Sequence, residues 1–85
     1  MFEAARQVFS DYLFEYGIDP ALFPTPTVTD RSNGDKSYKW ITTGARGIPV
    51  GVEVTVKKRK SAKPEWMLIG DTDAWLPLVG SKNKP

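Results

Sequence analysis

The sequence of 85 residues contains no cysteine and no histidine. Without cysteine there is no disulfide framework, no thiolate nucleophile and no Cys-based zinc site. Without histidine, the commonest metal ligand and the usual general base near neutral pH are also missing. Both absences weigh against an enzyme and against a transition-metal site. We therefore predict a non-enzymatic protein with no cofactor.

Long apolar runs and a strong excess of charge are also missing. No run approaches the roughly 20 apolar residues that a membrane span requires, and the N-terminal residues do not form a secretory signal. We therefore expect no membrane association and a cytoplasmic location. The net charge is only +2. The length suits one domain with a modest core, and the three Trp, three Tyr and four Phe must supply much of its burial.

The clearest pattern is an alternation of valine with other residues from Val50 to Val56, followed by four consecutive cations at 57–60. Valines at every second position predict a β-strand with one buried face. The cations that follow indicate that this strand leads into a positively charged turn. The pattern defines an architecture and one electrostatic surface, but it does not identify a reaction.

Residues 2–16 place most of their apolar side chains in one helical stripe, and Gly17 is expected to end that helix. The later segments are separated by turn residues, and short turns between strands imply an antiparallel meander. We predict a single α+β domain over residues 1–80, in which an N-terminal amphipathic helix packs on a three- to four-stranded antiparallel β-meander. Residues 81–85 are predicted to be a disordered polar tail. The strands are expected at 27–31, 36–43, 49–59 and 65–70.

The two faces of this sheet differ in the sequence. Tyr38, Trp40 and Trp66 share the parity of the valines and are interpreted as core, although aromatic side chains on a sheet can also stack on bases. The opposite face carries apolar side chains at 41, 67 and 69. We predict that residues 74–79 fold over this second face, with Trp75 as the anchor; the alternative is that a partner covers it.

Phe14 lies opposite the apolar stripe of the predicted helix, where either a loop or a partner must cover it. Together with Trp75, Leu76 and Leu78 it forms the candidate protein-binding surface. The first functional hypothesis is therefore an accessory or inhibitory protein-interaction domain of unknown partner. The chain is expected to be a monomer or a weak homodimer.

The alternative hypothesis is a weak nucleic-acid-binding protein that uses the basic hairpin at residues 57–63. Lys and Arg side chains bind phosphates without sequence preference, and a two-stranded ribbon fits the major groove. Lysines at a strand end can also serve only to protect a sheet edge. The candidate residues are Arg46, Lys57, Lys58, Arg59, Lys60 and Lys63.

Four carboxylates form the one candidate acidic constellation: Asp35, Glu65, Asp71 and Asp73. An Asp-x-Asp pair can contribute to a site for a hard cation. The simpler interpretation is that Asp71 or Thr72 caps a short turn that leads to Trp75.

Overall fold

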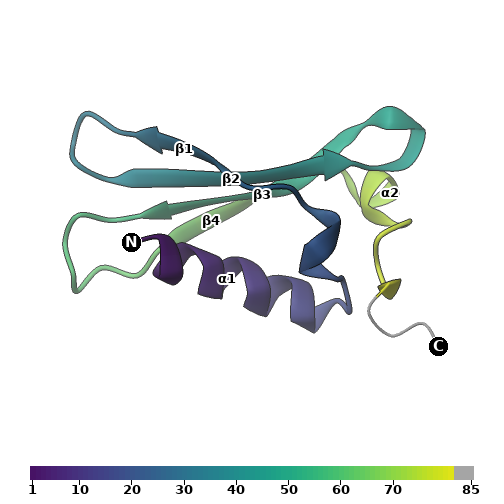
Figure 1. Cartoon of the computed structure of the whole chain (residues 1–85), viewed down its shortest axis with the longest axis horizontal. Helices are drawn as coiled ribbons and strands as arrows, with labels where there is room; N and C mark the ends of the chain where they lie inside the picture. Colours follow the sequence, from purple (N-terminus) through teal and green to yellow (C-terminus); the bar gives the residue numbers. More distant parts are fainter. Residues whose placement is uncertain (82–85) are drawn as a thin grey trace.

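The computed structural model describes residues 1–81 as a long helix packed on a four-stranded antiparallel sheet (Figure 1). This confirms the predicted α+β class and the meander order of the strands. Residues 82–85 of the predicted tail lie outside the described residues. Ser81 is described, and its Oγ accepts a hydrogen bond of 3.0 Å from the backbone N–H of Asp19. In chain order the elements, in which η marks a 3-10 helix, are α1 (Phe2–Glu15), η1 (Pro20–Leu22), β1 (Thr27–Asp30), β2 (Lys36–Thr43), η2 (Ala45–Gly47), β3 (Pro49–Val56), β4 (Glu65–Ile69) and α2 (Thr72–Trp75).

The end of α1 lies at the predicted glycine. Gly17 adopts φ 68°, a left-handed conformation that a residue without a Cβ takes at no steric cost. Its N–H bonds the carbonyl of Phe14 at 3.1 Å, and the N–H of Ile18 bonds the carbonyl of Leu13 at 2.8 Å. These two bonds satisfy carbonyls that the end of a helix leaves unpaired. The turn also directs Ile18 into the core.

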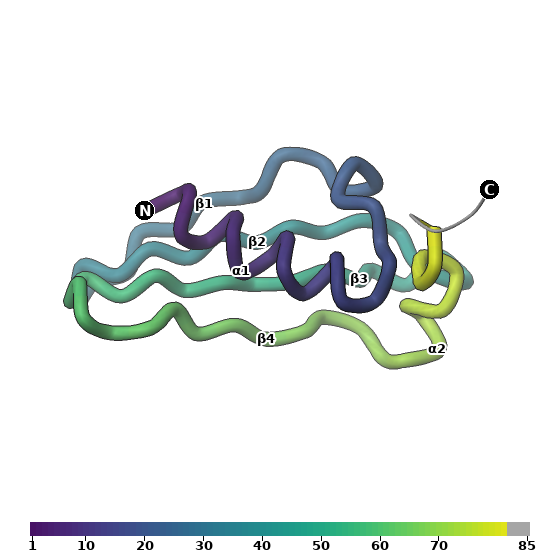
Figure 2. Tube along the Cα trace, turned by 90° about the horizontal axis from the view of Figure 1, so that it is seen from below, coloured from purple at the N-terminus to yellow at the C-terminus, as the bar shows by residue number. Residues whose placement is uncertain are grey.

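The sheet has the order β1-β2-β3-β4, and all neighbouring strands are antiparallel. The register places Val54 between Tyr38 on β2 and Trp66 on β4. Because side chains alternate between faces, the even-numbered strand residues share the face that α1 covers. Figure 2 shows α1 lying over the middle strands, with β4 along one free edge of the sheet.

Aromatic rings connect α1 to this covered face. Phe9 stacks on Trp40 with ring centroids 4.3 Å apart, and Phe23 meets Phe9 edge to face at 5.3 Å. Tyr38 and Trp40 are buried, as are all the valines of β3. The interpretation as core side chains is therefore confirmed for Tyr38 and Trp40. It is wrong for Trp66, which is 48% exposed because it lies on the edge strand β4.

Gly51 lies on the opposite face of β3, where β2 approaches closely. A Cβ at this position would collide with the backbone carbonyl of Trp40. The register neighbours of Gly51 are Ile41 and Ile69, so these side chains flank a position that has none of its own. Both isoleucines are only partly exposed, although α1 lies on the other face of the sheet (Figure 2).

The prediction that residues 74–79 cover this second face is wrong. Trp75 lies on the helix side of the sheet, with its ring centroid 6.0 Å from that of Phe23 and 6.1 Å from that of Tyr12. Its indole N–H donates to the carbonyl of Ile69 at 2.9 Å. The helix side offers the indole aromatic neighbours. It also offers an acceptor for the indole N–H, and a buried Trp usually requires such an acceptor.

The odd-numbered face of the sheet therefore stays open. It carries Met67, which is 57% exposed, among charged and hydroxyl side chains of β2, β3 and β4. This open face and the loops at its end are the parts of the fold where a binding site can be sought.

Candidate functional site: a basic hairpin tip beside an open sheet face

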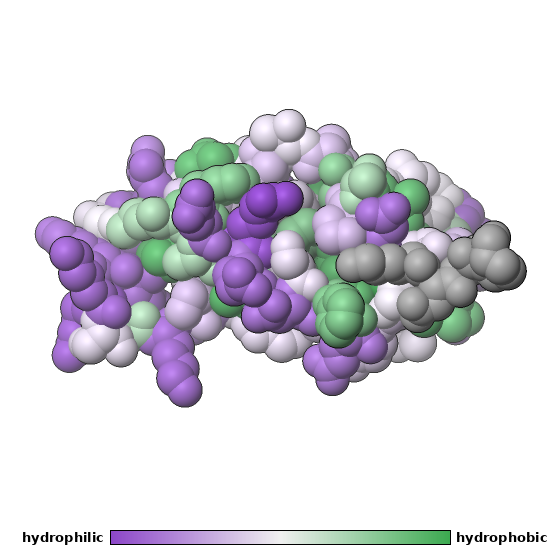
Figure 3. All heavy atoms as spheres, turned by 60° about the horizontal axis from the view of Figure 1, so that its bottom comes forward, coloured by the Kyte–Doolittle hydropathy of each residue, from purple (hydrophilic) through white to green (hydrophobic). Residues whose placement is uncertain are grey.

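Two hairpin loops lie together at one end of the sheet, the left-hand end in Figure 1. One joins β1 to β2 and the other joins β3 to β4. Figure 3 shows hydrophilic side chains projecting at this end. The β3–β4 loop carries four exposed cations that make no ion pair within residues 1–81. We call these four residues the basic tip: Lys58, Arg59, Lys60 and Lys63.

Asp35 fastens the two loops to each other. Its Oδ1 accepts a hydrogen bond of 2.8 Å from the backbone N–H of Lys58, and its Oδ2 lies 3.6 Å from Nζ of Lys57. Asn33 donates to Oδ2 at 3.1 Å and accepts from the backbone N–H of Asp35 at 3.0 Å. The stem of Lys58 packs where a Cβ on Gly34 would lie, 2.7 Å from the nearest carbon of the lysine. The basic tip is therefore anchored at its base.

These contacts shift two titrations. The hydrogen bond from the N–H of Lys58, helped by Lys57 and Asn33, lowers the pKa of Asp35 below its ordinary value of 3.8. Lys57 donates to Glu65 at 2.8 Å, and this bond, with Asp35 nearby, raises the pKa of Lys57 above its ordinary value of 10.5. Both shifts favour the charged forms. Lys57 is thus held by two carboxylates and is not available to a ligand in the way that the basic tip is.

Replacing Asp35 with asparagine is expected to lower the Tm at neutral pH, because the ion pair with Lys57 is lost. A carboxyl whose folded-state pKa is depressed stabilises the fold above its unfolded pKa and loses this effect as the pH falls through the folded value. The Tm difference between wild type and Asp35→Asn should therefore shrink as the pH falls from 7 to about 2.

Thermal melts over that pH range measure this difference. Asp30→Asn is the control, since Asp30 is an exposed carboxylate 3.6 Å from Lys36, and exposed pairs contribute little. A difference for Asp35→Asn that stays constant down to the lowest pH would show that the charge of Asp35 does not fasten the loops.

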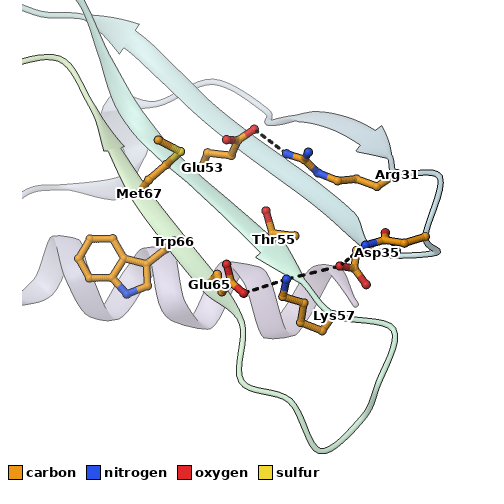
Figure 4. Close-up of a pocket in the computed structure, with 9 residues that line it drawn as sticks. Arg31, Asp35, Glu53, Thr55, Lys57, Glu65, Trp66 and Met67 are labelled. Carbon is orange, nitrogen blue, oxygen red and sulfur yellow. Dashed lines mark hydrogen bonds and ion pairs between the residues drawn. The ribbon is translucent and has the colours of Figure 1, made fainter.

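A hollow of about 320 Å³ lies beside the tip on the face turned away from α1 (Figure 4). Glu53 lies 3.8 Å from Arg31 within it. The guanidinium of Arg31 donates to Oγ of Ser37 at 3.1 and 3.2 Å, and that oxygen is 2.9 Å from Oγ1 of Thr55. Charges of both signs therefore alternate across the hollow and satisfy one another.

The structure brings together most of the residues predicted to bind nucleic acid, but not all of them. Arg46 lies in η2 between β2 and β3, at the opposite end of the sheet from the basic tip (Figure 1). Lys57 lies at the base of the tip, bound to Asp35 and Glu65. The cations that a single ligand could contact together are therefore those of the basic tip.

The predicted protein-binding residues divide in the same way. Phe14 is 72% exposed and Leu76 59%, whereas Trp75 and Leu78 are buried in the core at 5% and 6%. Burial removes Trp75 and Leu78 from any accessible surface of this structure. A protein partner stays a prediction, and of the four residues only Phe14 and Leu76 are accessible to one.

The four carboxylates do not gather. Asp35 and Glu65 share Lys57 at the basic end, while Asp71 is the N-cap of α2 and Asp73 lies within that helix. Asp71 accepts a hydrogen bond of 2.8 Å from the N–H of Ala74, so the predicted helix cap is confirmed. Within residues 1–81 no cluster of three or more metal-ligating side chains is present. The same residues include no helix of the length and apolarity needed to cross a membrane.

Sequence reasoning missed the polar network of the open face. Arg31 precedes β2, Ser37 lies on β2, and Glu53 and Thr55 lie on β3, and no motif joins these segments. Ser37 and Thr55 become neighbours only through the pairing of β2 with β3. Both residues have odd numbers within predicted strands, and this was the one available signal. It predicts that they lie on the same face of the sheet, but not that they are neighbours.

Comparison with protein-family models, with curated proteins and with solved structures found no significant match to this chain. Its function is therefore inferred from its own residues and their geometry.

Proposed function

We propose that this chain is a non-enzymatic binding module whose basic tip contacts the phosphate backbone of nucleic acid. The observation that carries the proposal is the basic tip itself, in which four exposed cations share one loop and make no ion pair with any residue up to Ser81. Asp35 anchors the base of that loop through Lys58, so part of the ordering needed for binding is already present in the free protein.

Protection of a sheet edge explains these cations less well. Lysines prevent the edge of a sheet from pairing with another chain when they lie on the edge strand itself. Here β3 ends at Val56 and β4 begins at Glu65, so the basic tip lies in the loop beyond both strands. The edge strand β4 contains no lysine between Glu65 and Ile69. The charge is therefore placed where it projects from the sheet rather than where it blocks pairing.

The expected mode of binding is contact with phosphates rather than reading of bases. Tyr38 and Trp40 are buried, which leaves Trp66, 48% exposed on β4, as a single ring rather than a platform of several rings on which single-stranded bases could stack. A hairpin tip of this kind can approach a duplex groove, where lysine and arginine neutralise phosphates regardless of sequence. We therefore expect similar affinities for duplexes of unrelated sequence.

Binding to a short generic DNA duplex is expected to weaken steeply with salt. If all four cations of the basic tip neutralise phosphates, the slope of log K against log salt should be about −3 to −4. Arg59, Lys60 and Lys63 together changed to glutamine should bring the slope to about −1. Lys58 is kept because its stem and backbone N–H belong to the anchored base. Fluorescence anisotropy over a salt series measures both slopes.

The matched control changes Arg6, Lys39 and Arg46 to glutamine, three exposed cations that make no ion pair within the described chain. This control has the same net charge as the tip variant. It should keep the wild-type slope and most of the affinity. Equal losses in both variants would mean that net charge alone attracts the duplex. No binding by the wild type at low salt would overturn the proposal.

A further inference from the structure

The two edges of the sheet are built differently. β1 is a short polar strand, whereas β4 has the sequence EWMLI. Trp66, Met67 and Leu68 on this strand are 48%, 57% and 42% exposed. All five residues of β4 pair regularly with β3, and neither lysine, proline nor a bulge interrupts them. The outer backbone groups of such an apolar edge can pair with another strand.

An apolar groove runs beside this edge on the helix side. It has a volume of about 340 Å³ and lies between the end of α1, β4 and α2. Towards the basic end, the ring of Tyr12 lies 5.2 Å from that of Trp66 and extends the apolar surface along β4. Figure 2 shows β4 at this uncovered margin of the sheet. The residues of the groove include Tyr12, Tyr16, Leu68, Leu76 and Val79.

Charge along the edge favours a second copy of the same chain as the occupant. Lys63 precedes β4 and Asp71 follows it. Glu65 at the start of β4 is held by Lys57 at 2.8 Å, so the charge that remains along the edge is positive at one end and negative at the other. An antiparallel copy related by a two-fold axis through Met67 would bring Lys63 next to Asp71 of the second copy, and the same contact would occur twice. In this register all five residues of β4 pair.

The side chains match in the same register. Trp66 lies opposite Leu68 of the second copy, and both belong to the covered face, so both copies of α1 lie on one side of the joined sheet. The apolar groove of each copy then continues towards that of the other. Shifting the axis to a neighbouring residue would leave part of β4 unpaired or would place Pro64, which has no N–H, in the ladder.

We propose that β4 pairs antiparallel with β4 of a second copy of this chain about a two-fold axis through Met67, joining the two four-stranded sheets into one continuous sheet. The pairing itself uses the backbone of β4 and does not require nucleic acid, although Lys63 belongs both to the basic tip and to the proposed contact with Asp71.

Disulfide trapping in the full chain tests the register directly. The chain has no cysteine, so Met67→Cys introduces a single thiol. On the axis this thiol faces itself, at a Cα separation of about 4.5–5.5 Å that a disulfide spans. Leu68→Cys is the control, because its own copies are offset along the strands beyond about 7 Å. We expect rapid oxidation of Met67→Cys to a cross-linked dimer and little cross-linking of Leu68→Cys. Equal rates for the two variants would overturn the proposal.

Sedimentation of chains without introduced cysteine gives an independent measurement. The wild type should pass from 9.5 kDa towards twice that mass as its concentration rises. Met67→Lys should stay monomeric, because it places two like charges at the axis, while Val28→Lys on the half-exposed position of β1 should dimerise as the wild type does. Circular dichroism establishes that both variants fold. A wild type that remains monomeric at all concentrations, or that pairs β4 only with an added extended peptide, would overturn the proposal.

Discussion

Replacing Val54 with aspartate is expected to unfold the domain. Val54 is fully buried in the third of four strands, between Tyr38 and Trp66 in the register. Within the described chain no buried side-chain polar atom lacks a partner, so no donor is waiting there for a new carboxylate. An unpaired buried charge costs about 3–5 kcal/mol or more. A domain of only 85 residues lies near the low end of the usual range of about 5–15 kcal/mol, so this loss removes most or all of its stability.

Far-UV circular dichroism and urea titration at neutral pH measure this effect. Val28→Asp is the control, because Val28 has the same parity but is half exposed on β1, and it should change the free energy of unfolding by less than about 1 kcal/mol. Burial raises the pKa of an introduced carboxyl, so Val54→Asp should recover stability relative to wild type as the pH falls. Cooperative unfolding of Val54→Asp at the wild-type midpoint would show that the face of β3 is wrongly assigned.

Local patterns were sufficient to predict most of the fold. The alternating valines predicted β3, and Gly17 predicted the end of α1, because each depends on residues close in sequence. The helix cap at Asp71, one of the two residues named for it, was predictable for the same reason. These signals specify the backbone of one segment at a time, and short turns then leave a meander as the simple arrangement.

The course of the C-terminal segment could not be predicted in the same way. Apolar residues at 41, 67 and 69 suggested that the second face needs a cover, and Trp75 was near enough to provide it. The sequence does not reveal that Gly51 leaves the position between Ile41 and Ile69 without a side chain. It also does not reveal that the helix side has a place for an indole beside Phe23. Both facts depend on contacts between segments far apart in the chain.

The candidate site was predictable only in its charge. The run of cations was visible, but the sequence does not show that Lys57 differs from the cations of the basic tip. Lys57 is held by Asp35 from the β1–β2 loop and by Glu65 from β4. The separation of Arg46 from the tip follows from the alternating direction of the strands, which sends successive turns to opposite ends of the sheet. Which cations meet a carboxylate therefore depends on how the strands are arranged in the sheet.

Replacing Trp75 with alanine is expected to destabilise the fold by about 3–5 kcal/mol, as for other large aromatic side chains removed from a core. Trp75 is only 5% exposed, and its ring lies next to those of Phe23 and Tyr12. Trp75→Phe should lose less, about 1–3 kcal/mol, because it keeps an aromatic ring but leaves the carbonyl of Ile69 without its donor. Leu76→Ala is the exposed control and should change stability by no more than about 0.5 kcal/mol.

A double-mutant cycle determines which face of the sheet Trp75 supports. The cycle combines Trp75→Phe with Phe23→Leu on the helix side, and separately with Ile41→Val on the open face. Residues in contact show coupling of about 0.5–3 kcal/mol, whereas distant ones add to within about 0.5 kcal/mol. We expect coupling with Phe23, whose ring centroid is 6.0 Å from that of Trp75, and additivity with Ile41. Two mutations show coupling only when the side chains they change share contacts. Coupling with Ile41 and additivity with Phe23 would therefore place the indole over the open face. Urea titration of the four variants in each cycle gives the required free energies of unfolding.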